Sequence, residues 1–206
     1  MTGIDAARYS QIQGYEFEFW QNNVVDFQVL WGHYLPPFVP HLPKHCGTVV
    51  DVGSGPMPFF LSGLFDYDEA WAVDPLIYEY AMLRRYAPLY SEFSMRRTIG
   101  EIEDQFADTV FALNVLDHVR DPELLIAELG RICKPGGLLF FFVDIDKLPD
   151  HMHPHRLDGA WTREWIELFF EIVHAEVLPS WKFDNLCLWI VGRRFHEGSA
   201  YQFVQA

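Results

Sequence analysis

From residue 47 onward, short apolar runs alternate with segments whose apolar residues recur at helical spacing. This alternation is typical of β-α-β units, and it predicts a doubly wound α/β fold built on a parallel sheet. Such a sheet binds its ligands beyond the carboxyl ends of its strands. The seven runs that we expect to be strands span residues 47–52, 69–73, 94–98, 109–114, 137–144, 171–178 and 186–193.

Helices are expected between these runs. Residues 121–133 carry the clearest signals, because Asp121 suits the N-cap position and Pro122 the first helical turn. Two further helices are expected, one over residues 75–88 and one from about residue 162.

The region before the sheet predicts one amphipathic helix over residues 15–31, followed by a connector with four prolines in "YLPPFVPHLPKHCG". A chain of 206 residues suffices for one well-cored domain and a modest extension. We therefore expect an N-terminal helical extension at 1–44 and the main domain at 45–206. The apolar residues that lie along one face of the predicted helix are Phe17, Trp20, Val24, Phe27, Leu30 and Trp31.

The first predicted strand runs into the glycine turn "DVGSGPMP" at residues 51–58. A dinucleotide-binding turn has the pattern G-x-G-x-x-G and seats a pyrophosphate at a helix N-terminus. Here Gly53 and Gly55 are present, but the third glycine is replaced by Pro58. Asp51 would also repel a pyrophosphate, whereas its carboxylate would favour a cationic ligand.

S-adenosylmethionine meets this requirement, since it carries a sulfonium and an ammonium group and no phosphate. Asp74 ends the second predicted strand, where an acid can accept both hydroxyls of a ribose. The same position also fits a nicotinamide cofactor. Asp74 therefore predicts a nucleoside ligand without choosing between the two.

Three segments together resemble the class I S-adenosylmethionine-dependent methyltransferases, especially their small-molecule branch. They are "VVDVGSGP", "WAVDPL" and "TVFALNVLDHVRDPELLIAELGRICKPGGLLFF", and the resemblance covers roughly residues 45–194. It implies a Rossmann-like, mostly parallel seven-stranded sheet with helices on both faces and a reversed last strand. It also implies an S-adenosylmethionine-binding enzyme that methylates a small molecule on oxygen or nitrogen by in-line transfer.

The resemblance further implies where the cofactor lies. The glycine turn would surround the methionine moiety, Asp74 the ribose, and "GEIE" at 100–103 the adenine amino group. In many members of the family an N-terminal helix covers this cleft as a lid, which would bring Tyr15, Trp20 and Trp31 to the substrate; docking on the sheet edge is the alternative. The implied cofactor-binding residues are Asp51, Gly53, Ser54, Gly55, Asp74, Pro75, Leu76, Glu101, Ile102, Leu113 and Asn114.

Two features depart from the family pattern. Met57 stands where a third glycine is often found, and the helical segment after it, "PFFLSGLFD", is short. Both leave open a non-catalytic binding protein of the same fold. A nicotinamide-dependent oxidoreductase is a further alternative, which Asp51 and Pro58 disfavour.

Methyl transfer requires above all that the nucleophile and the methyl group be held close and aligned. Where a proton must leave the acceptor, histidine is the favoured base because its ordinary pKa lies near neutrality. His118 follows the fourth predicted strand at the ligand edge and is the first candidate. The alternative role for His118 is to buttress the following helix.

The segment "DIDKLPDHMHPHRL" after the fifth predicted strand supplies His153 and His155 as further catalytic candidates. Alternate histidines on an extended chain can form a metal site. No cysteine or acid follows at a ligand spacing, and Pro154 interrupts the segment. The sequence therefore favours a loop over the substrate and no metal site.

The formal net charge of −14 disfavours nucleic acid and anionic membranes as partners. No stretch has the length of a membrane span, and the first residues do not resemble a signal peptide, so a soluble, cytoplasmic protein is expected. The three cysteines are expected to be reduced core thiols. An aromatic content of 17% suits an aromatic or apolar small-molecule substrate, and no pattern indicates an oligomeric state.

Overall fold

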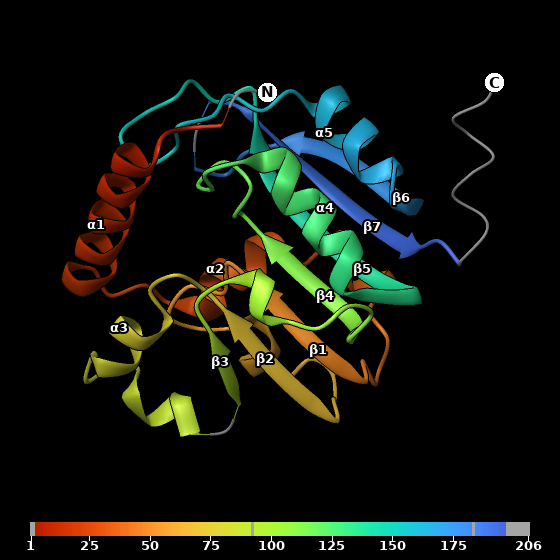
Figure 1. Cartoon of the computed structure of the whole chain (residues 1–206), viewed down its shortest axis with the longest axis horizontal. Coiled ribbons are helices and arrows are strands. Elements are labelled where there is room, and N and C mark those ends of the chain that lie inside the picture. Colours follow the sequence, from red (N-terminus) through yellow and green to blue (C-terminus); the bar gives the residue numbers. More distant parts are fainter. Residues whose placement is uncertain (1–2, 92, 183, 197–206) are drawn as a thin grey trace.

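The computed structural model describes residues 3–91, 93–182 and 184–196, so the end of the predicted main domain lies outside the described residues. A twisted seven-stranded sheet crosses its centre (Figure 1). The order of strands is β3-β2-β1-β4-β5-β7-β6, and all adjacent pairs are parallel except those that β7 forms with β5 and β6. The strands are β1(Thr48–Val52), β2(Glu69–Val73), β3(Ser94–Arg96), β4(Ala107–Leu113), β5(Cys133–Ile145), β6(Phe170–Pro179) and β7(Leu186–Arg194).

The expectation of a mostly parallel α/β sheet is confirmed, and each strand begins or ends within a few residues of its predicted bounds. β5 differs most, because the "KPGG" segment joins its start through a register shift between Ala107 and Thr109 of β4 and does not form a separate turn. The central strands are buried on both faces, as the unbroken apolar runs require.

Helices cover the two faces of the sheet and bury separate apolar clusters. On one face lie α4(Pro122–Ile132), which packs on β5, and α5(Gly159–Glu167), which packs on β6 (Figure 1). The predicted helix at 121–133 is confirmed, and Asp121 caps it by accepting a hydrogen bond from the amide of Leu124 at 3.1 Å. The other face carries α2(Phe27–Tyr34) and α3(Ile77–Met82) over an aromatic-rich cluster.

The helix expected over residues 75–88 is wrong in length. α3 ends at Met82, and a 3-10 helix, η3(Ala87–Ser91), follows it. Pro88 is the second residue of η3. At this position a 3-10 helix needs no amide hydrogen bond within the helix, so the donor that proline lacks is not missed.

The single N-terminal helix expected over residues 15–31 is also wrong, because two helices occupy this region. They are α1(Ala6–Asn22) and α2, and Asn23 between them is extended. Asp26 causes the restart by accepting hydrogen bonds from the amides of Gln28 and Val29, which makes it the N-cap of α2. The helical periodicity of the apolar residues continues across this break and conceals it.

Among the residues that the structure describes, no helix is both long and apolar enough to cross a bilayer. The three cysteines are buried and free, as expected.

Candidate functional site

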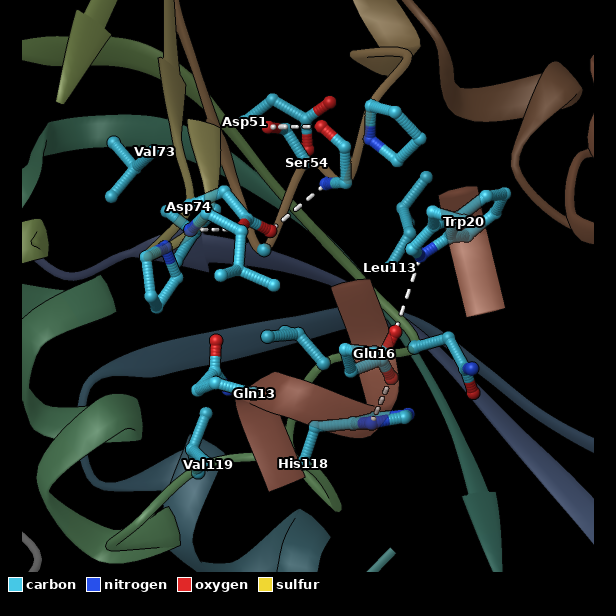
Figure 2. A pocket seen from close by; sticks show the side chains of 18 of the residues that line it. Gln13, Glu16, Trp20, Asp51, Ser54, Val73, Asp74, Leu113, His118 and Val119 are labelled. Atoms are coloured by element: carbon cyan, nitrogen blue, oxygen red, sulfur yellow. Dashed lines mark hydrogen bonds and ion pairs between the residues drawn. The ribbon is translucent and has the colours of Figure 1, made fainter. Parts of the chain in front are cut away.

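A cavity of about 1480 Å³ opens at the carboxyl ends of β1, β2 and β4. Its walls are the glycine turn, the ends of these strands, the loop after β5 and helix α1. Figure 2 shows Asp51 and Ser54 toward one end of this space and His118 toward the other. Pockets for a single small ligand usually measure ~300–1,000 Å³, so the cavity has room for two ligands side by side.

The glycine turn brings backbone into the cavity. Gly53 has φ +68°, and a Cβ atom there would lie 2.2 Å from Cγ2 of Val115 in the loop after β4. Gly55 has φ +57°, but a Cβ atom there would meet no atom within 4 Å. The first glycine is therefore required by packing and the second by backbone conformation, next to open space.

Asp51 at the end of β1 fastens the turn. Its buried Oδ2 accepts a hydrogen bond of 2.5 Å from the amide of Phe59, the first residue of the 3-10 helix η2(Phe59–Ser62). Burial raises the pKa of Asp51 to about 7, although the Phe59 amide opposes this shift. A cation bound in the cavity would favour the ionised form of this carboxyl group.

Asp74, directly after β2, holds the other side of the turn. Its Oδ2 accepts from the amide of Gly55 at 3.1 Å, and its Oδ1 accepts from the amide of Leu76 at 2.8 Å. Burial raises the pKa of Asp74 to about 6. Each carboxylate oxygen can accept a second hydrogen bond, so Asp74 can still receive the hydroxyls of a ribose.

Most of the predicted cofactor-binding residues line this cavity. Met57 also lines it, and its side chain is packed against the aromatic-rich cluster beneath α2. The predicted residues found in the lining are Asp51, Gly53, Ser54, Gly55, Asp74, Pro75, Leu76, Leu113 and Asn114.

Glu101 and Ile102 lie elsewhere. Glu101 closes a capping box with Thr98, accepting hydrogen bonds from its amide and hydroxyl at 2.9 and 3.2 Å. Ile102 is buried in the cluster beneath α4. Ile99 and Gly100, the two residues directly before Glu101, line the cavity in their place. The pattern "TIGE" fits a capping box, which could have indicated the structural role of the acid.

Helix α1 forms the wall that the sequence reasoning described least well. Trp20 lines the cavity as expected, and so does Trp31 of α2, but Tyr15 packs edge-on against the exposed His151 at 5.2 Å. Glu16, which sequence reasoning missed, lies on the same side of α1 as Trp20 and accepts a 3.1 Å hydrogen bond from its indole nitrogen. Further lining residues of α1 are Tyr9, Gln13 and Phe19.

Both ends of α1 are tied to other parts of the chain. Arg8 donates to the backbone carbonyls of Asp150 and His151 in the loop after β5, at 3.1 and 3.4 Å. At the other end, Arg85 donates to the carbonyls of Gln21 and Asn23. In α1 itself Ile12 is buried and the other side chains are half-buried or exposed. The polar contacts at its ends therefore act together with Phe17 and Trp20, which pack on the aromatic-rich cluster, to hold the helix over the cavity.

His118 lies in the loop after β4 and contacts α1. Its Nδ1 is 2.7 Å from Oε1 of Glu16, and its Nε2 is 3.8 Å from Oδ1 of Asp117 (Figure 2 shows the Glu16 contact). Burial opposes a charge on this imidazole, but the two carboxylates outweigh burial and raise the pKa of His118 to about 9. At neutral pH His118 is therefore protonated and is not by itself a proton acceptor.

The three histidines after β5 do not converge. His153 lines the cavity, with its ring centroid 4.3 Å from that of His118, and burial together with the charge of His118 lowers its pKa. His155 is buried behind the loop, where its Nε2 lies 2.8 Å from the carbonyl of Val119. This contact joins the loops after β4 and β5 and gives His155 a structural role. His151 contacts Tyr15 instead.

Part of the sequence is similar to known methyltransferases. Residues 50–141 match the family model described as "Methyltransferase domain". The chain is 29% identical over 108 residues to a tRNA U34 carboxymethyltransferase of Syntrophotalea carbinolica, a match that covers 48% of this chain and 33% of the relative. It is 29% identical over 90 residues to the human thiol S-methyltransferase TMT1B, covering 43% of this chain and 30% of the relative.

These matches span about a third of the length of either curated relative. Among solved structures, the fold is similar to that of 1,6-didemethyltoxoflavin-N1-methyltransferase of Burkholderia thailandensis, which was crystallised with bound 1,6-didemethyltoxoflavin and S-adenosylhomocysteine. The TM-score is 0.66 at 17% identity, and the match covers 94% of each chain.

The family match over residues 50–141 includes the glycine turn, Asp74 and the loop of His118, and the seven-stranded fold extends the likeness to nearly all described elements. Residues 50–141 thus match a methyltransferase domain, and the fold is similar to that of a methyltransferase crystallised with S-adenosylhomocysteine.

Proposed function

We propose that this chain binds S-adenosylmethionine along the glycine turn and transfers its methyl group to a small molecule held under α1. The observation that carries the proposal is that one cavity joins the Gly53–Gly55 turn and Asp74 to an aromatic wall. The volume of this cavity suits a cofactor and a second, smaller molecule. In-line transfer needs this arrangement, because the acceptor atom must approach the methyl carbon from the side opposite sulfur.

Charge supports a cationic cofactor. Asp51 and Asp74 are buried beside the turn, and burial destabilises the ionised form of each carboxyl group when no cation lies near it. A sulfonium and an ammonium group would offset this cost, whereas a pyrophosphate would increase it. A nicotinamide dinucleotide is therefore the less favoured ligand.

The acceptor side of the cavity favours a small, partly apolar molecule. Trp20, Phe27 and Trp31 line it, and α1 covers it. One curated relative acts on tRNA by its name, but a net charge of −14 opposes binding of a polyanion here. We therefore propose a small-molecule acceptor that is methylated on oxygen or nitrogen, with residues 1–44 acting as the lid of the domain at 45–206.

His118 and His153 are the residues that we place at the acceptor. Both line the cavity, and the charged His118 and the neutral His153 lie against each other. His155 buttresses the loop that carries His153. Substitution of His153 should lower kcat more than it changes the cofactor affinity, because it lies away from the glycine turn.

Isothermal titration calorimetry of the full chain with S-adenosylhomocysteine, S-adenosylmethionine and NADH tests the proposal. We expect one site for each of the first two ligands and no heat from NADH. Saturable NADH binding without binding of the sulfur-containing ligands would overturn it. Absence of all binding by a folded protein would indicate a non-catalytic member of the fold.

A further inference from the structure

Asp117, His118 and His153 form a cluster beside the proposed acceptor space. Their ligand-capable atoms all lie within 4.8 Å of one another. Nε2 of His118 is 3.8 Å from Oδ1 of Asp117, and Nε2 of His153 is 4.0 Å from Oδ2 of the same carboxylate. These separations are too long for hydrogen bonds. They are somewhat wider than the ~3.3 Å between two atoms that each lie ~2.0 Å from one tetrahedral ion.

The second nitrogen of each imidazole contacts a further carboxylate. Nδ1 of His118 lies 2.7 Å from Glu16. Nδ1 of His153 lies 2.8 Å from Asp150 and 2.7 Å from Nζ of Lys147. The Nε2 atom of each imidazole faces Asp117. Histidines that bind metal ions usually have this arrangement, in which a carboxylate orients the ring through the nitrogen that does not bind the ion.

Asp117 provides the independent sign of a ligand. Its side chain is 2% exposed, yet neither oxygen accepts a hydrogen bond from any residue that the structure describes. A buried carboxylate without hydrogen bonds costs several kcal/mol unless a cation offsets its charge, and the protonated His118 at 3.8 Å offsets it only in part. Asp117 is thus directed at the two imidazoles and bonded to neither.

The charges around the cluster favour a divalent cation. Glu16, Asp117 and Asp150 bring three negative charges, and Lys147, which is 3.2 Å from Asp150, brings one positive charge. In the free protein His118 is protonated and the sum is −1. An ion that displaces this proton meets two neutral imidazoles and a sum of −2. One divalent ion would bring it to zero.

We propose that Asp117, His118 and His153 bind one divalent transition-metal ion, and that this ion holds a hydroxyl oxygen of the methyl acceptor. The donor set of two imidazoles and one carboxylate with open positions is that of zinc and non-haem iron sites. Sequence spacing indicated no such site, because only His153 comes from the histidine-rich segment and its partners come from the loop after β4.

The choice of acceptor rests on the proposed function. An ion at this position lowers the pKa of a bound hydroxyl, whose proton leaves to solvent. The oxygen then forms a bond to the methyl carbon as the bond from carbon to the sulfonium sulfur breaks. The electron pair of that bond stays on sulfur and yields S-adenosylhomocysteine, so no oxidant or further reactant is required.

Titration of the chelator-treated full chain with CoCl₂ tests the ion site without cofactor or acceptor. We expect one Co²⁺ per chain with visible absorption bands of a protein-bound ion, and displacement of these bands by ZnCl₂. Each of the variants Asp117→Asn and His153→Ala should weaken binding at least tenfold. Glu16→Gln should weaken it by ~10- to 100-fold, as expected for a residue that orients a ligand.

Two control variants separate this cluster from other histidines. His151→Ala removes an exposed neighbour in the same loop, and His41→Ala removes a partner of the stacked pair with His174 on another face. Both should bind Co²⁺ like the unmodified chain. Loss of binding only in His41→Ala, or less than a tenth of an equivalent bound by the unmodified protein, would overturn the inference.

Calorimetry with S-adenosylhomocysteine on the metal-free chain and on Asp117→Asn separates the two proposals. We expect affinities within a few-fold of each other, because the cluster lies away from the glycine turn. Cofactor binding without Co²⁺ binding would overturn the ion site alone. Co²⁺ binding without cofactor binding would overturn the proposed function and the assigned acceptor.

Discussion

Replacement of Asp74 by asparagine separates its proposed role in the cofactor site from its role in the fold. Asp74 is 8% exposed and accepts hydrogen bonds from the amides of Gly55 and Leu76. Asparagine keeps the shape of the side chain and one acceptor oxygen. It replaces the other oxygen by an NH₂ group, which cannot accept a hydrogen bond from the backbone amide of Gly55 or Leu76 that faces it. The proposed ribose would thereby lose an ionised acceptor.

The magnitudes follow from burial and hydrogen bonding. The rise in the pKa of Asp74 from 3.8 to about 6 corresponds to ~3 kcal/mol against the ionised form in the free protein. This net cost already includes the two backbone hydrogen bonds, so removal of the charge recovers it. The NH₂ group of asparagine, turned toward a backbone amide, costs ~1–3 kcal/mol as an unpaired donor. Because these terms nearly cancel, Tm at pH 8 should change by no more than ~4 °C. Loss of a charge-assisted bond to the ribose should weaken cofactor binding by ~10- to 150-fold.

Calorimetry with S-adenosylhomocysteine and a thermal melt without ligand measure the two effects. Asp68→Asn is a matched control, since Asp68 is an exposed acid at the opposite end of β2 and should change neither quantity. Unchanged cofactor affinity in Asp74→Asn would refute the placement of Asp74 at the ribose. A large fall in Tm would show that the residue serves the fold more than the ligand.

Three further predictions concern the turn and α1. Because burial raises the pKa of Asp51 to about 7, the favourable contribution of this group to stability is present at low pH and is lost as pH rises through 7. The rise in Tm on adding S-adenosylmethionine should therefore be larger at pH 8 than at pH 6. Equal rises at the two pH values would contradict this prediction. Gly55→Ala should cost ~1–2 kcal/mol of stability through backbone strain alone, whereas Gly53→Ala should cost clearly more because its Cβ would overlap Val115; equal costs in urea unfolding would argue against this packing. Arg85→Ala should speed amide hydrogen exchange in α1 and leave the exchange of β4 unchanged, and unaltered exchange of α1 would show that this contact does not hold the lid.

The strands and the glycine turn could be predicted because their signals are local. Unbroken apolar runs define the buried strands, and the turn needs Gly53 and Gly55 for reasons visible in the backbone of each residue. The order of motifs then placed Asp74 at the end of the neighbouring strand, where it meets Gly55.

Features that depend on distant parts of the chain could not be predicted in this way. Glu16 and His118 are 102 residues apart in sequence, and only the docking of α1 brings them within 2.7 Å. The break after α1 escaped notice because Asp26 interrupts a continuous apolar period with a cap. Glu101 was assigned to the cofactor from its position in a motif, while its side chain serves the local backbone.

We propose above all that the cavity at the carboxyl ends of β1 and β2 binds S-adenosylmethionine. The most direct measurement is equilibrium dialysis of the full chain against radiolabelled S-adenosylmethionine, with S-adenosylhomocysteine and NADH as competitors. We expect one bound molecule per chain, displaced by S-adenosylhomocysteine and not by NADH. A folded chain that binds no label, or releases it to NADH, would refute this assignment of the cavity.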